Sequence, residues 1–162
     1  ETALAVEGLE GVEFLVGGFG TLVPQLERLC SRLQNTRYLG PVPPDEVATR
    51  TMEADAVLLA LDPANLNNRL ATPNKFYEAM AAGIPLVTCK ELLLGHFVAD
   101  AGIGVAFAWR NWRELRRVIA GLRDAPEERG AMGRRARTLA EERFSWTVCE
   151  ARLAELYDRL SD

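Results

Sequence analysis

The residues best suited to do chemistry lie between positions 72 and 85, at the start of an expected helix. A helix advances about 100° per residue, so Asn74 and Glu78 stack on one face with Lys75 beside them. The Glu78 carboxylate could accept two hydrogen bonds from a vicinal diol such as a ribose. The alternative is an ordinary surface helix, in which Lys75 and Glu78 form an ion pair worth a few tenths of a kcal/mol.

The residues just before this face favour an anion. Pro73 suits a first helical position and Thr72 can act as its cap. The unpaired amides of the first turn carry positive dipole character, so a phosphate could bind there without a basic side chain.

Elements alternate along the chain in a way that predicts an α/β fold, a Rossmann-like parallel sheet flanked by helices. The expected strands are 12–16, 36–39, 56–61, 85–89 and 104–108. The expected helices between them are 22–33, 44–53, 73–82 and 91–101, followed by a helical C-terminal segment at 112–123, 126–142 and 146–160. We expect residues 1–162 to form a single domain.

Two further loops follow expected strands. Gly18 and Gly20 could let a ligand approach the backbone closely, or could simply form a tight turn. Gly40, Pro41 and Val42 form a stiff segment that could border a planar base or serve only as a crossover. Ligands of open parallel sheets collect at the carboxyl ends of strands, so these loops and the polar helix start are expected at one edge.

Composition narrows the function classes. The net charge of −4 gives no global attraction for nucleic acid or an anionic membrane. Cys30, Cys89 and Cys149 are widely spaced among apolar residues, which favours reduced, buried thiols in a cytoplasmic protein. His96 has no neighbours that would complete a catalytic triad or a metal site. No catalytic residue and no metal ligand is predicted.

Five blocks, taken in order, resemble the C-terminal, donor-binding half of a GT-B glycosyltransferase, most similar to the retaining group called family 4. The blocks are Val-Gly-Gly-Phe-Gly (16–20), Tyr-Leu-Gly-Pro-Val-Pro (38–43), Ala-Asp-Ala-Val-Leu-Leu (54–59), Pro-Asn-Lys-Phe-Tyr-Glu-Ala-Met-Ala-Ala-Gly-Ile-Pro (73–85) and Phe-Ser-Trp (144–146).

The resemblance implies a nucleotide-diphosphate sugar, with UDP or GDP, as the donor and no metal or other cofactor. It implies that Glu78 holds the ribose hydroxyls, that backbone amides from Ala71 to Asn74 hold the diphosphate, and that Gly40 to Val42 border the base. One departure is Leu70, which stands where the family commonly has a sugar-facing glutamate.

The resemblance also implies partners. The family's acceptor domain, its first strand and its basic diphosphate clamp precede the segment that matches, so we interpret the chain as a fragment that is inactive alone. In the family the last helix crosses to the other domain, so we expect its Trp146, Leu153 and Tyr157 stripe to be exposed or to pair with a second chain. The full-length enzyme is expected in the cytoplasm, with contact at the inner membrane face left open.

Two rival functions remain at this point. The first is a nucleotide-sugar 2-epimerase of the same fold, which needs acids and a histidine in its cleft. The second is a non-catalytic interaction module, which Leu70 favours.

Overall fold

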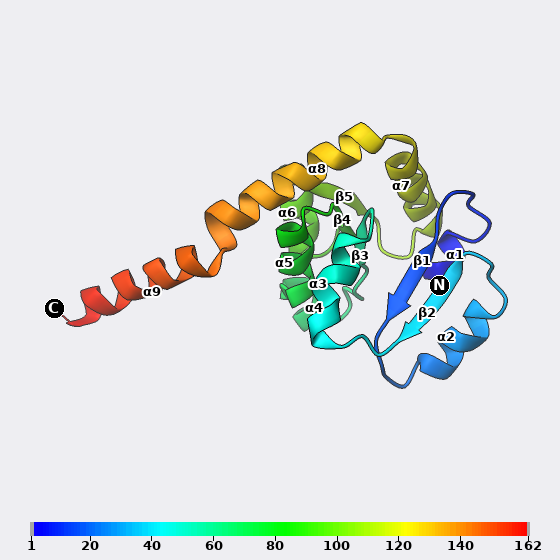
Figure 1. Ribbon diagram of the computed structural model, residues 1–162, viewed down its shortest axis with the longest axis horizontal. Helices are drawn as coiled ribbons and strands as arrows, with labels where there is room; N and C mark the ends of the chain where they lie inside the picture. Colours follow the sequence, from blue (N-terminus) through cyan, green and yellow to red (C-terminus); the bar gives the residue numbers. More distant parts are fainter. Residues whose placement is uncertain (1, 162) are drawn as a thin grey trace.

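The computed structural model describes residues 2–161 and has parallel strands covered by helices (Figure 1). The strands are β1 (Phe14–Gly17), β2 (Thr36–Gly40), β3 (Val57–Leu59), β4 (Leu86–Cys89) and β5 (Gly104–Phe107). The helices are α1 (Thr2–Ala5), α2 (Val23–Cys30), α3 (Pro44–Met52), α4 (Leu66–Leu70), α5 (Asn74–Ala82), α6 (Leu93–Asp100), α7 (Trp112–Asp124), α8 (Pro126–Leu139) and α9 (Trp146–Ser161), with a π-helical segment η1 (Ala140–Phe144) between the last two. The predicted α/β class is confirmed.

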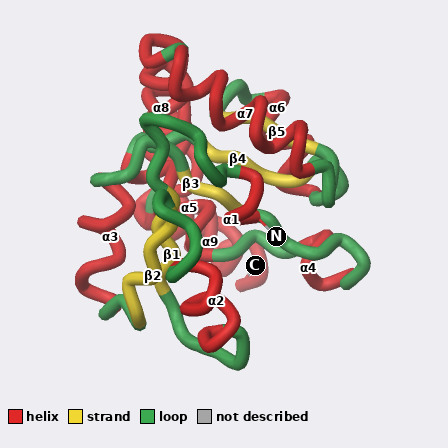
Figure 2. The backbone as a smooth tube through the Cα atoms, turned by 90° about the vertical axis from the view of Figure 1, so that its right-hand side faces the viewer, coloured by secondary structure: helices red, strands yellow, loops and turns green. Residues whose placement is uncertain are grey.

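The strands are hydrogen-bonded in two groups rather than in the single sheet that the sequence predicts. β1 pairs with β2, and β4 pairs with both β3 and β5, all in parallel. Figure 2 shows β3 between the β1–β2 pair and β4, so the two groups are neighbours without a shared ladder among the described residues. β3 has only three residues, which limits the ladder that it can form.

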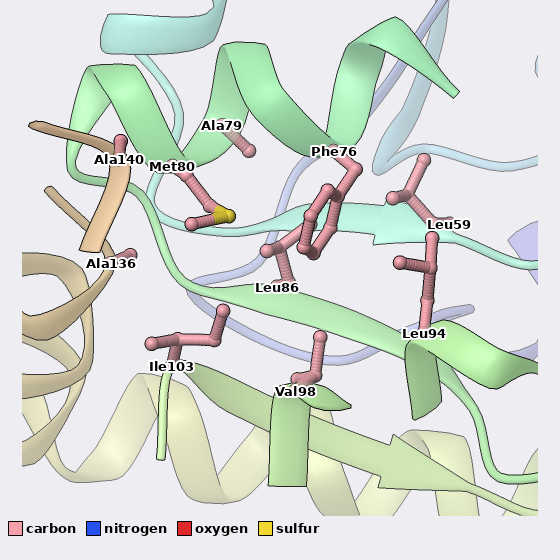
Figure 3. Close-up of a cluster of buried hydrophobic side chains, with 10 residues drawn as sticks. All are labelled: Leu59, Phe76, Ala79, Met80, Leu86, Leu94, Val98, Ile103, Ala136 and Ala140. Carbon is pink, nitrogen blue, oxygen red and sulfur yellow. The ribbon is translucent and has the colours of Figure 1, made fainter. Parts of the chain in front are cut away.

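The core lies on the two faces of the three-stranded sheet. β4 is buried at every position, as expected for a central parallel strand with helices on both sides. One apolar cluster lies between this sheet and α5, α6 and α8, and includes Phe76, Met80, Leu86 and Ile103 (Figure 3). The other cluster joins the opposite face to α1 and α7.

The far end of α5 is fixed by close backbone packing against α8. Gly83 ends α5 in the left-handed conformation, with φ of 71°, and the Ile84 amide donates to the Ala79 carbonyl at 2.9 Å. Gly133 of α8 packs so closely on Gly83 that an added Cβ would lie 2.1 Å from the Gly83 carbonyl oxygen. The Arg137 guanidinium donates to the Ala81 carbonyl, so α8 also satisfies an end carbonyl of α5.

The C-terminal segment leaves the body of the protein as an arm. α8 continues into η1, and α9 then runs away from the sheet (Figure 1). Trp146 is 73% exposed, and Leu153, Leu156 and Leu160 are also exposed along α9. The expected exposure of this stripe is confirmed. Cys149 lies on the same helix and is exposed, Cys30 is partly exposed, and only Cys89 of the three is buried, so the prediction that all three thiols are buried is wrong for Cys149 and Cys30.

Helix caps follow the sequence in two places. The Asn111 side chain accepts from the Glu114 amide at 3.1 Å, and the Ser145 hydroxyl accepts from the Val148 amide at 3.4 Å. The sequence did not predict α4, whose Asn65 cap accepts from the Asn67 amide at 2.9 Å. No helix among residues 2–161 is long and apolar enough to cross a membrane.

Candidate functional site

The glycine loop and the proline segment lie against each other at the carboxyl ends of β1 and β2. The Gly18 amide donates to the Gly40 carbonyl at 2.8 Å, and a Cβ on Gly17 would lie 2.6 Å from the Val42 side chain. Gly18, Gly20 and Gly40 all have positive φ, of 140°, 146° and 75°, which other residues rarely adopt. The expected convergence of these two loops is therefore confirmed.

Tyr38 stabilises this junction, and sequence reasoning did not assign it a role. Its hydroxyl donates to the Gly18 carbonyl at 2.6 Å, which fixes the loop from the neighbouring strand. The sequence signal that could have indicated this role is the position of Tyr38, two residues before Gly40, which ends the strand. Phe19, at the tip of the loop, is 90% exposed.

The start of α5 has no side-chain cap. The residue at the N-cap is Pro73, with no capping hydrogen bond, and α5 itself begins at Asn74. The prediction that Thr72 caps the helix with Pro73 inside it is wrong by one position, because Pro73 is extended, with ψ of 152°. The amides of Asn74 and Lys75 consequently have no side-chain cap and stay available to an anion, whereas the Phe76 amide donates to the Pro73 carbonyl at 2.9 Å.

This helix start lies where the strand order predicts. Figure 3 shows Phe76, in the first turn of α5, above Leu59 at the carboxyl end of β3, with Met80 toward the other end of the strand. Asn74 and Lys75 are exposed beside it. The polar face therefore lies at the edge where parallel sheets bind ligands.

Glu78 is partly buried one turn inside the helix and has no protein partner. Within residues 2–161 neither Lys75 nor Glu78 takes part in an ion pair, so the surface-pair alternative is not found. A partly exposed carboxylate without a protein partner can accept hydrogen bonds from a ligand as well as from water. Its position on the face of Asn74 leaves it available to a hydroxyl donor.

The segment before α5 runs from α4 through an extended residue. Leu70 ends α4 and is 60% exposed, while Ala71 has ψ of 143° and leads the chain into Thr72. Asp62 is engaged locally, since its carboxylate accepts from the Ala64 amide at 2.9 Å. Leu70, Thr72, Asn74 and Lys75 are all exposed along this segment, and Glu78 is partly exposed.

Contact between this surface and the two glycine-containing loops is indirect. α3 begins directly after the proline segment and packs against α5. A groove with a volume of about 560 Å³ lies elsewhere, between α6 and α8. Its walls include Phe97, Leu139 and Arg134, and no candidate donor residue lines it. The candidate site is therefore separate from this groove.

Two other acids near the carboxyl ends of β4 and β5 are occupied by protein groups. The Glu91 carboxylate accepts from the Trp109 amide at 3.1 Å through either oxygen. The Lys90 ammonium donates to Glu114 at 2.6 Å, and this bond, with a second from the Ala108 amide, holds the pKa of Glu114 below its usual value. Sequence reasoning missed the pair of Lys90 and Glu114, although Lys90 directly follows the predicted strand 85–89.

The remaining ionisable groups give no sign of a metal or a reactive thiol. Among residues 2–161 no group of His, Cys, Asp and Glu side chains could hold a metal ion, and His96 is exposed on α6. Burial, with a smaller effect of the Glu91 charge, raises the pKa of the Cys89 thiol to about 12. That thiol is therefore protonated at neutral pH and a poor nucleophile.

Comparison with known proteins relates this arrangement to a family. Residues 3–158 match the family model described as "Glycosyl transferase-like". A curated relative, D-inositol 3-phosphate glycosyltransferase 2 of Catenulispora acidiphila, is 34% identical over 82 residues, which is 51% of this chain and 19% of the relative.

Solved structures show the same fold. HepE of Anabaena, in complex with UDP-glucose, aligns with a TM-score of 0.77 at 21% identity, over 97% of this chain and 43% of HepE. Sucrose-phosphate synthase of Thermosynechococcus elongatus aligns with a TM-score of 0.78 at 17% identity, over 98% of this chain and 41% of the synthase. The chain thus spans about two fifths of these GT-B proteins and about a fifth of the curated relative. Because the family match covers nearly every residue, this chain belongs to the glycosyl transferase-like family, with the fold of a GT-B glycosyltransferase domain.

Proposed function

We propose that this domain binds the nucleotide diphosphate of a sugar donor within a glycosyltransferase. The observation that carries the proposal is Glu78, a half-buried carboxylate without a protein partner one turn inside a helix whose first amides have no side-chain cap. The two features lie at the spacing of one helical turn, on the face that holds Asn74. The UDP-glucose complex of HepE, which shares the fold, supports a donor of this class.

Each part of the donor has a candidate partner of matching chemistry. Within the segment from Ala71 to Asn74, the amides of Ala71, Thr72 and Asn74 would hold the diphosphate, because Pro73 has no N–H group, and the α5 dipole would offset the charge of the leaving group. Glu78 would accept hydrogen bonds from the ribose hydroxyls. The backbone from Gly40 to Val42, held against the glycine loop, would border the base. The proposal requires no metal.

The described face is a partial site. Leu70 supplies an exposed apolar side chain beside the proposed diphosphate position and no acceptor for a sugar hydroxyl. We propose that the remainder of the protein provides the acceptor site and a basic clamp, and that it covers the apolar stripe of α9. Self-association through α9 is the alternative arrangement. Transfer with retention and a cytoplasmic site of action are part of the same proposal, by resemblance to the family.

The test is a titration of this chain with UDP and GDP, followed by heteronuclear NMR. We expect millimolar binding with shift changes at the start of α5, because the site is incomplete. Glu78→Gln should weaken binding about tenfold or more, since a charged acceptor of two hydroxyl groups is lost. Glu127→Gln, an exposed acid in the first turn of α8, is the matched control and should bind as the wild type does.

Unchanged binding in the Glu78→Gln variant would refute the assignment of the ribose site. A non-catalytic module remains the second candidate function, favoured by Leu70 alone. Transferase assays of the full-length protein with Glu78→Gln separate the two, because a catalytic role requires loss of product.

A further inference from the structure

Four aromatic rings form a closed cycle beneath the start of α5. Phe76 and Tyr77 of α5 have ring centroids 5.1 Å apart. Phe97 of α6 lies 5.7 Å from Phe76, and Phe144 of η1 lies 5.5 Å from Tyr77 and 6.1 Å from Phe97. All four pairs meet edge to face, the geometry that aromatic rings favour. The cycle therefore joins three elements at fixed relative angles.

The π-helical segment η1 carries the fourth ring of the cycle. α8 and η1 together present Gly133, Ala136 and Ala140 to α5. Phe144, which ends η1, is half-buried against Tyr77, whereas the neighbouring Arg143 is exposed.

Tyr77 and Glu78 are adjacent in the same helical turn. A ring that holds the Tyr77 side chain in place therefore also sets the direction in which Glu78 projects from the helix axis. At its other end α5 is already held by Gly133 and Arg137 of α8. In these first turns, where the polar face lies, Phe144 links η1 to Tyr77.

We propose that Phe144 is a positioning residue that sets the rotation of the first turns of α5 through Tyr77, and thereby the aim of Glu78. Its consequence for ligand binding rests on the donor site proposed above. The orientation itself does not, because it can be measured in the protein without any ligand.

The experiment measures residual dipolar couplings of backbone N–H groups in the free protein. In Phe144→Leu the couplings of residues 75–80 should change as a set relative to those of β4 and β5. Phe144→Tyr keeps the ring and should give the wild-type orientation.

A control separates positioning from general loss of stability. Ile119 packs against the other apolar cluster. The variant Ile119→Val should lower the free energy of unfolding by a similar small amount, about 0.5–1.5 kcal/mol. We expect UDP to bind at least fivefold more weakly to Phe144→Leu and equally well to Ile119→Val. Wild-type couplings in Phe144→Leu, or equal weakening by Ile119→Val, would overturn the proposal. If wild-type protein binds no UDP, the donor site fails and the couplings alone decide the role of Phe144.

Discussion

The contact between Gly133 of α8 and Gly83 of α5 allows a prediction with a matched control. Gly133→Ala would place a Cβ 2.1 Å from the Gly83 carbonyl oxygen, more than 1 Å inside the 3.4 Å at which ordinary contact begins. Both groups belong to the backbone, so no side chain can rotate away and the two helices must separate. Gly121, in the interior of α7, has nothing within 4 Å of the same added atom.

Both substitutions should stabilise their helices, but only Gly133→Ala also carries a cost from overpacking. Replacing a glycine inside a helix by alanine stabilises the helix by about 0.5–1 kcal/mol. Overpacking costs about 1–3 kcal/mol, and we take the upper end because two backbones are forced apart. Gly133→Ala should therefore lose about 2 kcal/mol of the free energy of unfolding, whereas Gly121→Ala should gain about 0.5–1 kcal/mol.

Urea unfolding followed by circular dichroism measures both values. For a domain of this size, a loss of about 1 kcal/mol in the free energy of unfolding lowers the melting temperature by about 2–4 °C. The melting temperature of Gly133→Ala should therefore fall by about 4–8 °C. A Gly133→Ala protein as stable as Gly121→Ala would refute the reasoning, because it would mean that α8 does not approach α5 as closely as the geometry states.

Two further predictions concern ionisable groups. The pKa of Glu114 is held below its value of 4.5 in the unfolded chain, so the stabilisation from its bonds to Lys90 and the Ala108 amide is complete above about pH 5 and is lost as the pH falls through the folded value. Unfolding measured from pH 7 to pH 3 should show a flatter acid limb for Glu114→Gln than for wild type, and identical limbs would contradict this linkage. A thiol reagent at pH 7 should modify Cys149 rapidly and Cys89 only in denaturant, since burial raises the pKa of Cys89 to about 12. Rapid modification that persists in Cys149→Ser, with Cys30 also replaced by serine, would show that Cys89 is accessible.

The sequence predicted those parts of the fold that local pattern and turn chemistry determine. Strand cores such as 86–89 and the capped start of α7 follow from apolar runs and from Asn111. α4 was missed because its asparagines favour turns, although Asn65 in fact caps the helix. The break between the β1–β2 pair and β3 depends on tertiary packing, which residue periodicity does not encode.

For the candidate site, the sequence located the polar face but not its surroundings. Asn74, Lys75 and Glu78 lie together as helical spacing requires. The extended Pro73 and the π turn at Ala140–Phe144 could not be predicted, because each differs by about one residue from the regular helix that the sequence predicts there. Such shifts are decided by contacts far along the chain.

The pairing order of the strands bears on how the protein is made. β1 pairs with β2, β3 with β4 and β4 with β5, so every ladder joins strands that are consecutive in the chain. Each pair of partners is separated by a crossover that contains at least one helix, so no ladder requires a strand from a distant part of the chain. During synthesis both strands of the β1–β2 pair leave the ribosome before β3, whereas β3 has no paired strand until β4 follows it. The contact of α8 with α5 can form only after all five described strands have been made.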